Sequence, residues 1–413
     1  MKEPAKKSVC SIAIITGGIL PVPASKGGAV ESLVEILCAQ NECNGEADLT
    51  VFSVSDEGSS DVGISDSYTH YCYTRVPLAI QKCDYLIGQF AEKILHKKNM
   101  MSYRYFMQRL WFLSDVKKKL IESQFDYLVL ENSALPLRCL QGKNARYLDK
   151  CFLHMHNVLS HTFGTNDELT KVKGYLSVSH YISQSILDSI PSLNPERCHV
   201  LPNAVDVSRF CSTDAAEQAD ILQSKFGIKE DDIVFLSTGR LTEEKGALQL
   251  LEAFINADLK KAKLVIAGGF FFDSDIKTPF EEKLRNLAQQ MSDRIIFTGF
   301  LPYDQMPAVY ALADVCCVPS IWDDPAPLAV IESLAAGKPL ITTNSGGIPE
   351  YADESCAFIL QRNEELTRNL SKAMKKLYED EKLRLQMGKS GREKALALYS
   401  PEKMYENFIR FFE

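Results

Sequence analysis

Two carboxylates, Asp324 and Glu332, are separated by a Pro-rich loop and the start of an apolar segment. We expect a helix to begin near Leu328, which would leave the backbone N–H groups of Leu328 and Ala329 free to bind an anion. A phosphate suits these amides, and the two carboxylates could hold hydroxyl groups of a ribose or another sugar. Alternatively, Glu332 is a solvated helix residue and the prolines only stiffen a turn.

Two cationic side chains, Arg240 and Lys245, follow an apolar run of strand length at 233–238 and precede a helical pattern at 247–256. This places them at the carboxyl edge of a parallel sheet, where open α/β folds bind ligands. Arginine offers a bidentate fork and lysine a mobile point charge, so the pair can bind one diphosphate. The alternative is a surface salt bridge to a neighbouring glutamate.

A pair of glycines, Gly27 and Gly28, lies after the predicted strand 11–16 and before a helix that we expect to begin near Ala29. Glycine lets the backbone approach a phosphate closely, and the helix adds its dipole. No G-x-G-x-x-G pattern follows the strand, so the sequence disfavours dinucleotide oxidoreduction.

His156 ends a predicted strand, 152–156, and is therefore a candidate for contact with a ligand. His154 lies on the same face and competes for this role, and a core or loop histidine is the alternative for both. Because side chains alternate along a strand, Cys151 and His154 face opposite sides. The three residues should not converge on zinc, and we expect no metal site.

Short apolar runs alternate with helical patterns along the whole chain, and this predicts two doubly wound parallel-sheet domains. A polar, acidic stretch at 212–220 interrupts the rhythm near the junction. Ser400 and Pro401 are typical of the first residues of a last helix. The predicted strands are 11–16, 49–54, 127–130, 152–156 and 175–178, then 233–238, 263–267, 295–298, 315–318 and 340–343.

The composition of the 413 residues is that of a globular enzyme, with 46% apolar and 24% charged residues. The formal charge of −8 argues against nucleic-acid binding. The 12 cysteines form no C-x-x-C pair and several lie in apolar runs, which favours buried thiols in a reducing cytosol. The first apolar run is too short for a signal segment, so we expect a cytoplasmic protein.

One segment, 91–121, has the opposite charge, with eight Lys or Arg against two acidic residues. Aromatic and methionine residues are interleaved with these cations. The mixture suits a helix on an anionic membrane surface, at the inner membrane face, or one that grips a charged acceptor. The alternative is a solvated helix pair whose aromatic residues fill the core of the first domain.

Several of these motifs resemble those of the retaining glycosyltransferases of family four. Asp324 to Glu332 has the spacing of that family's E-x7-E motif, with Asp in place of the first Glu. Gly239 to Gly246 resembles its G-R-x-x-x-x-K-G segment, and 201–210 its linker. The segments 336–339 and 344–350 are also similar. The likeness covers nearly the whole chain, is strongest over 239–350 and is weak over 55–122.

The resemblance implies a GT-B architecture, in which two Rossmann-like domains face a cleft. The first domain, 1–203 with the returning helix 400–413, would bind the acceptor, and the second, 204–399, the nucleotide-sugar donor. Asp324 and His156 would be catalytic. The implied donor-binding residues are Gly27, Gly28, Arg240, Lys245, Phe300 beside the nucleobase, Leu328, Ala329 and Glu332.

The implied activity is retaining transfer of a sugar from a nucleoside diphosphate sugar to a carbohydrate or lipid-linked acceptor. Surface polysaccharide or glycoconjugate synthesis is the expected setting, and no cofactor or obligate metal is expected. A GT-B phosphorylase or a nucleotide-sugar epimerase would share the phosphate-binding groups. A noncatalytic paralogue that binds a nucleotide sugar or a partner transferase is the other alternative, which Asp324 keeps open.

Overall fold

The computed structural model describes residues 9–55, 68–93, 105–269 and 278–413. The chain divides into two compact units, one formed by 1–201 with 404–413 and the other by 202–403. The predicted divisions were 203/204 and 399/400. Part of the basic segment 91–121, including Lys97, Lys98 and Arg104, lies outside the described residues.

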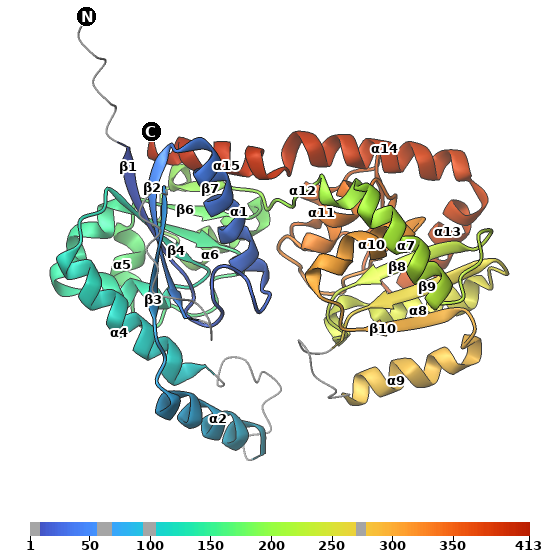
Figure 1. The fold of residues 1–413 in the computed structure, drawn as a ribbon, viewed down its shortest axis with the longest axis horizontal. Coiled ribbons are helices and arrows are strands. Elements are labelled where there is room, and N and C mark those ends of the chain that lie inside the picture. Colours follow the sequence, from blue (N-terminus) through green and yellow to red (C-terminus); the bar gives the residue numbers. More distant parts are fainter. Residues whose placement is uncertain (1–8, 56–67, 94–104, 270–277) are drawn as a thin grey trace, which may run out of the picture. The chain divides into compact units, whose positions relative to one another are not determined.

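The first unit contains a parallel sheet in the order β3-β2-β1-β4-β5-β6-β7 (Figure 1). Its central strands are short apolar runs, and in β1 the residues from Ile12 to Ile15 are completely buried. Apolar runs of this kind are typical of parallel sheets, because helices cover both faces of the sheet and bury the strands. The strands are β1 Cys10–Ile15, β2 Ala47–Val54, β3 Thr69–Thr74, β4 Tyr127–Glu131, β5 Cys151–Met155, β6 Gly174–Ser177 and β7 Cys198–Val200.

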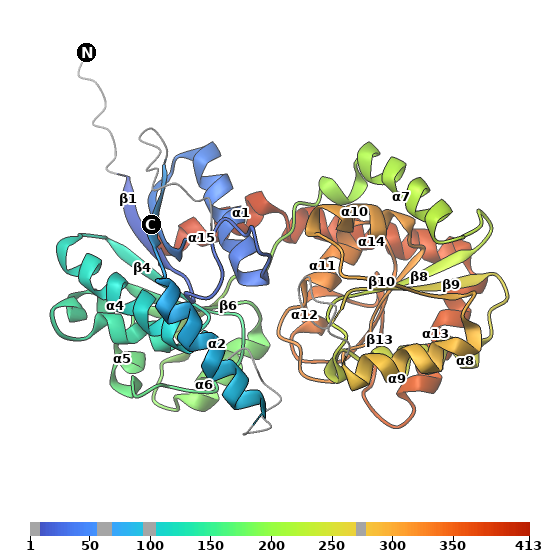
Figure 2. The same ribbon diagram turned by 60° about the horizontal axis from the view of Figure 1, so that its bottom comes forward.

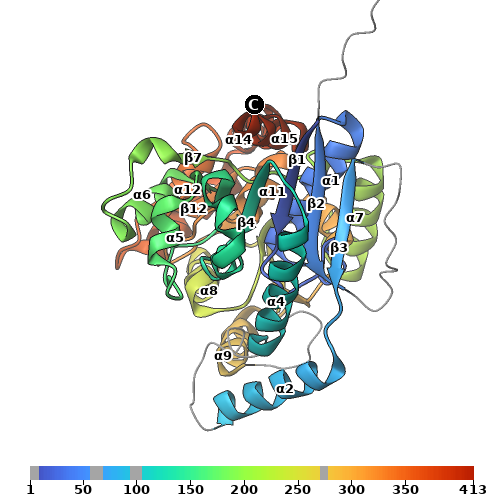
Figure 3. The same ribbon diagram turned by 90° about the vertical axis from the view of Figure 1, so that its left-hand side faces the viewer.

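Helices lie between most of the successive strands, since parallel pairing requires crossover connections, and the connection from β2 to β3 lies mainly outside the described residues. The α-helices of the unit are α1 Ala29–Asn44, α2 Leu78–Lys93, α4 Phe106–Glu122, α5 Asn166–Lys171 and α6 His180–Ser189. Short 3-10 helices are η1 Leu135–Leu140, η2 Gly142–Lys150 and η3 Pro195–Arg197. Figure 3 shows α2 beyond the end of the edge strand β3, beside α4.

The helix α4 has both buried and exposed aromatic side chains. Phe112 is completely buried, whereas Trp111 and Phe106 are 44% and 50% exposed. The carboxylate of Asp84 accepts hydrogen bonds from the backbone N–H groups of Met107 and Gln108, both at 2.8 Å, and so caps the start of the helix. One face of α4 therefore belongs to the core, and aromatic side chains remain on the surface.

The second unit contains a parallel sheet in the order β10-β9-β8-β11-β12-β13. The carboxyl ends of β8 and β11 are neighbours because these strands pair directly. The strands are β8 Ile233–Thr238, β9 Ala262–Ala267, β10 Ile295–Gly299, β11 Val315–Val318, β12 Leu340–Thr343 and β13 Ala357–Leu360.

The helices of the second unit cover both faces of its sheet. Figure 2 shows α8 and α9 on one side and α7 and α10 on the other. The helices are α7 Thr213–Lys225, α8 Ala247–Ala257, α9 Pro279–Ala288, α10 Met306–Leu312, α11 Leu328–Ala335, α12 Ile348–Tyr351, α13 Leu366–Glu379 and α14 Glu381–Leu398. The 3-10 helices are η4 Arg209–Cys211, η5 Glu243–Lys245, η6 Gln289–Met291 and η7 Tyr303–Gln305.

The end of the chain returns to the first unit through α15 Pro401–Ile409 and η8 Arg410–Phe412. Phe408 is completely buried, and the ring of Phe412 lies 5.5 Å from that of Phe152. The hydroxyl of Tyr405 donates to Asn41 Oδ1 at 2.7 Å. The last ten residues are therefore part of the first unit's core. Within the described ranges, no helix is long and apolar enough to cross a bilayer.

Candidate functional site

A pocket in the second unit lies at the carboxyl ends of β8 and β11, the edge at which open α/β sheets bind ligands. Arg240 and Lys245 both line it, so the structure brings the two predicted cations together. Arg240 is the more exposed, with 58% of its side chain accessible against 24% for Lys245. The lining also includes Ser237, Gly239, Pro319 and Ser320.

Lys245 forms an ion pair with Asp324, with 2.5 Å between Nζ and Oδ2. The Ser320 hydroxyl donates to the same oxygen at 3.2 Å. Asp324 is only 4% exposed, so its charge is compensated inside the unit. Lys245 also lies over the ring of Trp322, 5.5 Å from its centroid. The first carboxylate of the predicted motif is therefore bound to a lysine of the same pocket.

The loop that carries Asp324 is fixed by two glycines. The N–H of Gly347 donates to the Asp324 carbonyl at 2.9 Å, and the N–H of Gly346 donates to Asp323 Oδ1 at 3.3 Å. Gly346 has a φ of 50°, and a Cβ there would lie 2.4 Å from the Asp324 carbonyl oxygen. Only glycine fits this approach, because a side chain would displace the loop.

The helix α11 begins at Leu328, as predicted, and its N-cap residue Pro327 makes no side-chain capping bond. Among the described residues, the N–H groups of Leu328 and Ala329 have no hydrogen-bond acceptor, and both residues are partly exposed. Such amides are available to an anion.

Glu332 lies in the same helix and is 6% exposed. The hydroxyl of Tyr310 donates to its Oε2 at 2.8 Å, and Tyr310 in turn lies 2.7 Å from the hydroxyl of Thr238. Burial raises the pKa of Glu332, and hydrogen bonds from Tyr310 and Tyr303 only partly oppose this. Glu332 is thus held in a buried polar network. The alternative interpretation, that Glu332 is a solvated helix residue, is wrong.

Phe300 directly follows β10 and is 42% exposed. It is not among the residues that line the pocket at β8. Its predicted contact with a nucleobase stays a prediction.

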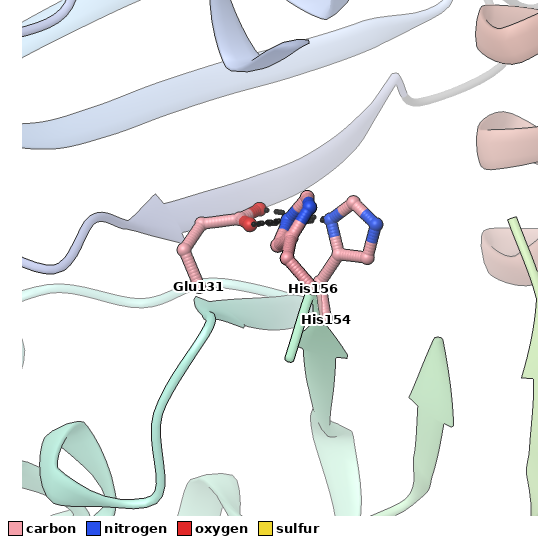
Figure 4. A group of neighbouring side chains, drawn as sticks. All are labelled: Glu131, His154 and His156. Atoms are coloured by element: carbon pink, nitrogen blue, oxygen red, sulfur yellow. Dashed lines mark hydrogen bonds and ion pairs between the residues drawn. The ribbon is translucent and has the colours of Figure 1, made fainter. Parts of the chain in front are cut away.

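The first unit holds a second cluster at the carboxyl ends of β4 and β5 (Figure 4). His154 and His156 lie on the same side, as predicted, with 4.2 Å between their ring centroids. Both face the carboxylate of Glu131. His154 Nδ1 lies 3.2 Å from Oε1, and His156 Nε2 lies 2.9 Å from Oε2. The exposed fractions are 0% for Glu131, 1% for His154 and 8% for His156.

Burial, charge and hydrogen bonds together set the pKa values of this cluster. Burial would raise the pKa of Glu131, but the charge of His154 and hydrogen bonds from both rings outweigh it and lower the pKa to about 2. Burial, followed by the charge of His154, lowers the pKa of His156 to about 4. At neutral pH, Glu131 is ionised and His156 is neutral.

Glu131 was not among the predicted site residues, although the sequence held a signal for it. Glu131 immediately follows the predicted strand 127–130, and in the sheet it pairs with His154. Cys151 is not in the cluster, so it and the two histidines do not converge, as the alternation of side chains predicted. Glu131, His154 and His156 do place ligand atoms within 4.8 Å of one another, a set that could hold a metal ion.

Gly27 and Gly28 both have positive φ, 73° and 109°, and Gly28 is the N-cap residue of α1. A Cβ on Gly28 would lie 2.3 Å from Glu31 Oε2. Burial raises the pKa of Glu31 to about 7, and the negative charge of Glu131 adds to this shift. The glycine loop therefore lies near a carboxyl group that titrates around neutrality.

Two solved structures resemble the chain over nearly its whole length. A glycosyltransferase from Rickettsia africae ESF-5 matches with a TM-score of 0.72 and 16% identity, covering 98% of each chain. Anabaena HepE, solved with UDP-glucose, matches with a TM-score of 0.68 and 16% identity, covering 97% of this chain and 99% of that one. The two parallel-sheet units therefore form the GT-B fold of glycosyltransferases, as predicted.

Residues 218–394 match the family described as "Glycosyl transferases group 1". YtcC of Bacillus subtilis (strain 168), whose name assigns it provisionally to the glycosyltransferases, is 28% identical over 399 residues, covering 94% of this chain and 88% of that protein. The second unit thus matches the model of a group 1 glycosyltransferase domain.

Proposed function

We propose that this chain transfers a sugar, with retention of configuration, from a nucleoside diphosphate sugar to a carbohydrate or lipid-linked acceptor. The observation that carries the proposal is the presence of Arg240 and Lys245 in one pocket at the carboxyl edge of the sheet. An anion with two phosphates matches this charge. The two N–H groups at the start of α11 supply further donors for a phosphate.

These groups also supply chemistry. The leaving diphosphate gains charge as the glycosidic bond breaks, and preorganised cations and amides stabilise it without a metal. In the mechanism implied by the resemblance, the leaving phosphate also helps to deprotonate the acceptor on the same face. We assign to Asp324 the stabilisation of positive charge at the sugar and to His156 a contact with the donor sugar.

A noncatalytic nucleotide-sugar-binding protein is the second candidate. The ion pair between Lys245 and Asp324 favours it, because that carboxylate is already engaged by a lysine of the pocket. A transferase would hydrolyse the donor slowly when no acceptor is present, whereas a noncatalytic protein would bind it unchanged. An epimerase would convert the donor without an acceptor, and a phosphorylase would require inorganic phosphate.

The first test is a panel of nucleoside diphosphate sugars read out by thermal shift. A ligand at 100 times its Kd adds about 2.7 kcal/mol of stability. We expect one donor to raise the melting temperature of the wild type and to raise that of Arg240→Ala much less. Release of the nucleoside diphosphate by the wild type then separates the two candidates. No shift with any donor would contradict the proposal.

We further propose action at the inner face of a membrane, in polysaccharide or glycoconjugate synthesis. The described part of the basic segment supports this, because Trp111 and Phe106 are exposed on α4. On the neighbouring helix α2, Leu86 and Tyr85 are 66% and 61% exposed. Flotation with anionic vesicles, compared with neutral ones, tests this location. Replacement of Phe106 and Leu86 by serine should release the protein.

A further inference from the structure

The carboxylate of Glu131 is completely buried, yet it forms no ion pair with a lysine or arginine in the part of the chain that the structure describes. Its two oxygens face only the rings of His154 and His156 (Figure 4). A buried charge is costly unless hydrogen bonds compensate it, so this arrangement needs a reason beyond stability.

An ionised carboxylate only accepts hydrogen bonds. Both nitrogens that face Glu131 must therefore carry a proton, which is on Nδ1 in His154 and on Nε2 in His156. In the neutral form of His156, this leaves Nδ1 with a free lone pair. One carboxylate thus fixes a proton on a different nitrogen in each of two neighbouring rings.

The backbone next to Glu131 holds the end of β5 in place. Asn132 adopts a left-handed conformation, with a φ of 55°, and its N–H donates to the His154 carbonyl at 2.7 Å. Its side-chain Oδ1 accepts from the His156 N–H and from Asn157 Nδ2, both at 3.2 Å. A strained non-glycine residue persists only where its surroundings fix it, and such residues cluster at functional sites.

We propose that Glu131 is a positioning residue that holds His156 in the tautomer with its proton on Nε2. His156 then presents Nδ1 as a hydrogen-bond acceptor, suited to a hydroxyl group of the sugar. Among the three residues, His156 is the least buried, with 8% exposed, while Glu131 and His154 lie deeper in the interior. The benefit for catalysis rests on the role proposed above for His156, but the tautomer itself does not.

The tautomers are measured directly by 15N NMR of the full chain with labelled histidine. His154→Gln and His156→Gln assign the two signals. In the wild type, we expect His156 to be neutral with its proton on Nε2 and His154 to carry a proton on Nδ1. In Glu131→Gln, which keeps the shape, His156 should become a mixture of tautomers. Glu31→Gln, which removes a half-buried carboxyl group of the same unit that makes no contact with His156 among those the structure shows, should leave His156 unchanged.

Kinetics provide the second readout. Glu131→Gln should lower kcat about tenfold and change the KM for the donor little, because misorientation of a group costs rate more than affinity. Glu131→Asp should recover part of the loss. Melting temperatures establish that both variants are folded.

Three results would overturn the inference: a wild-type His156 protonated on Nδ1, tautomers that Glu131→Gln does not change, or a transition metal bound by the cluster at one equivalent per purified chain. Wild-type turnover in His156→Gln would instead contradict the role of His156 in the proposed function. The 15N NMR result would then still decide whether Glu131 fixes the tautomer of His156.

Discussion

The two units use their charged side chains in opposite ways. In the second unit, Arg240 and Lys245 keep 58% and 24% of their side chains accessible, where an exchanging anion can reach them. In the first unit, the charge of Glu131 is completely buried and faces two imidazole rings. A group that binds and releases a ligand must stay accessible, whereas a group that orients another side chain works best in the interior. Mutations should separate these two uses.

The largest effect is expected for Asp324→Asn. It should reduce turnover about 10²-fold if the carboxylate stabilises positive charge at the sugar. The KM for the donor should not rise, because the substitution removes a negative charge beside Lys245. The measurement is steady-state kinetics with the true donor. The matched variant Glu332→Gln should act mainly on donor affinity. Equal, small effects of both substitutions would favour the noncatalytic candidate.

Donor affinity should fall ten- to hundredfold in Arg240→Ala and in Lys245→Ala, since a charged hydrogen bond contributes about 1.5–3 kcal/mol. The two variants should differ in stability. Lys245→Ala leaves Asp324 buried without its cation and should lower the melting temperature. The exposed ion pair of Arg240 and Glu244, at 3.8 Å, contributes little to stability. Arg240→Ala should therefore leave the melting temperature unchanged.

Calorimetric titration with the donor and thermal melting in its absence check both parts. Unchanged affinity in the two variants would remove these residues from the site. An equal loss of stability in both would contradict the contrast between the exposed and the buried ion pair.

A smaller effect should appear in the pH dependence of stability. The pKa of His156 in the folded protein, about 4, lies below its ordinary value of 6.5. Below pH 6.5 the unfolded chain therefore binds a proton that the folded chain refuses. The stability contributed by the neutral ring is complete above pH 6.5 and is lost as the pH falls towards 4.

The difference in melting temperature between wild type and His156→Gln should accordingly narrow from pH 7 to pH 4.5. Glu31, whose raised pKa of about 7 acts in the opposite direction, is present in both proteins and cancels in the difference. A difference that is constant with pH would show that His156 is not buried in its neutral form.

We expect treatment with EDTA to leave the transfer rate unchanged, which is the smallest effect of the series. Two cations and the amides of α11 can compensate the diphosphate without a metal. Transfer rates before and after dialysis against the chelator make the measurement. Loss of activity that Mg²⁺ or Mn²⁺ restores would contradict metal independence.

The parts of the fold that the sequence predicted are those whose pattern is local. The strands 233–238, 315–318 and 340–343 are present with the predicted bounds, because each is a short apolar run between turn residues. The strands β3, β7 and β13 were not predicted. In β3, the sequence Thr-His-Tyr-Cys-Tyr-Thr lacks an apolar run, since an edge strand needs fewer buried side chains.

The same distinction applies to the candidate sites. Arg240 and Lys245 belong to one short loop, so their proximity could be predicted from spacing alone. Glu131 and His154 are 23 positions apart and meet only because β4 and β5 pair in register. The ion pair between Lys245 and Asp324, 79 positions apart, depends likewise on the neighbouring ends of β8 and β11. No local pattern encodes either contact.

The return of the chain end to the first unit has a consequence for biosynthesis. The second unit is one continuous segment, 202–403, and can fold as soon as that segment has left the ribosome. The first unit still lacks Tyr405, Phe408 and Phe412 at that moment, and these side chains fill its core. Its earlier residues must therefore wait, with apolar surface uncovered, until 404–413 have been synthesised. The first unit, whose synthesis begins before that of the second, is thus the later of the two to complete its core.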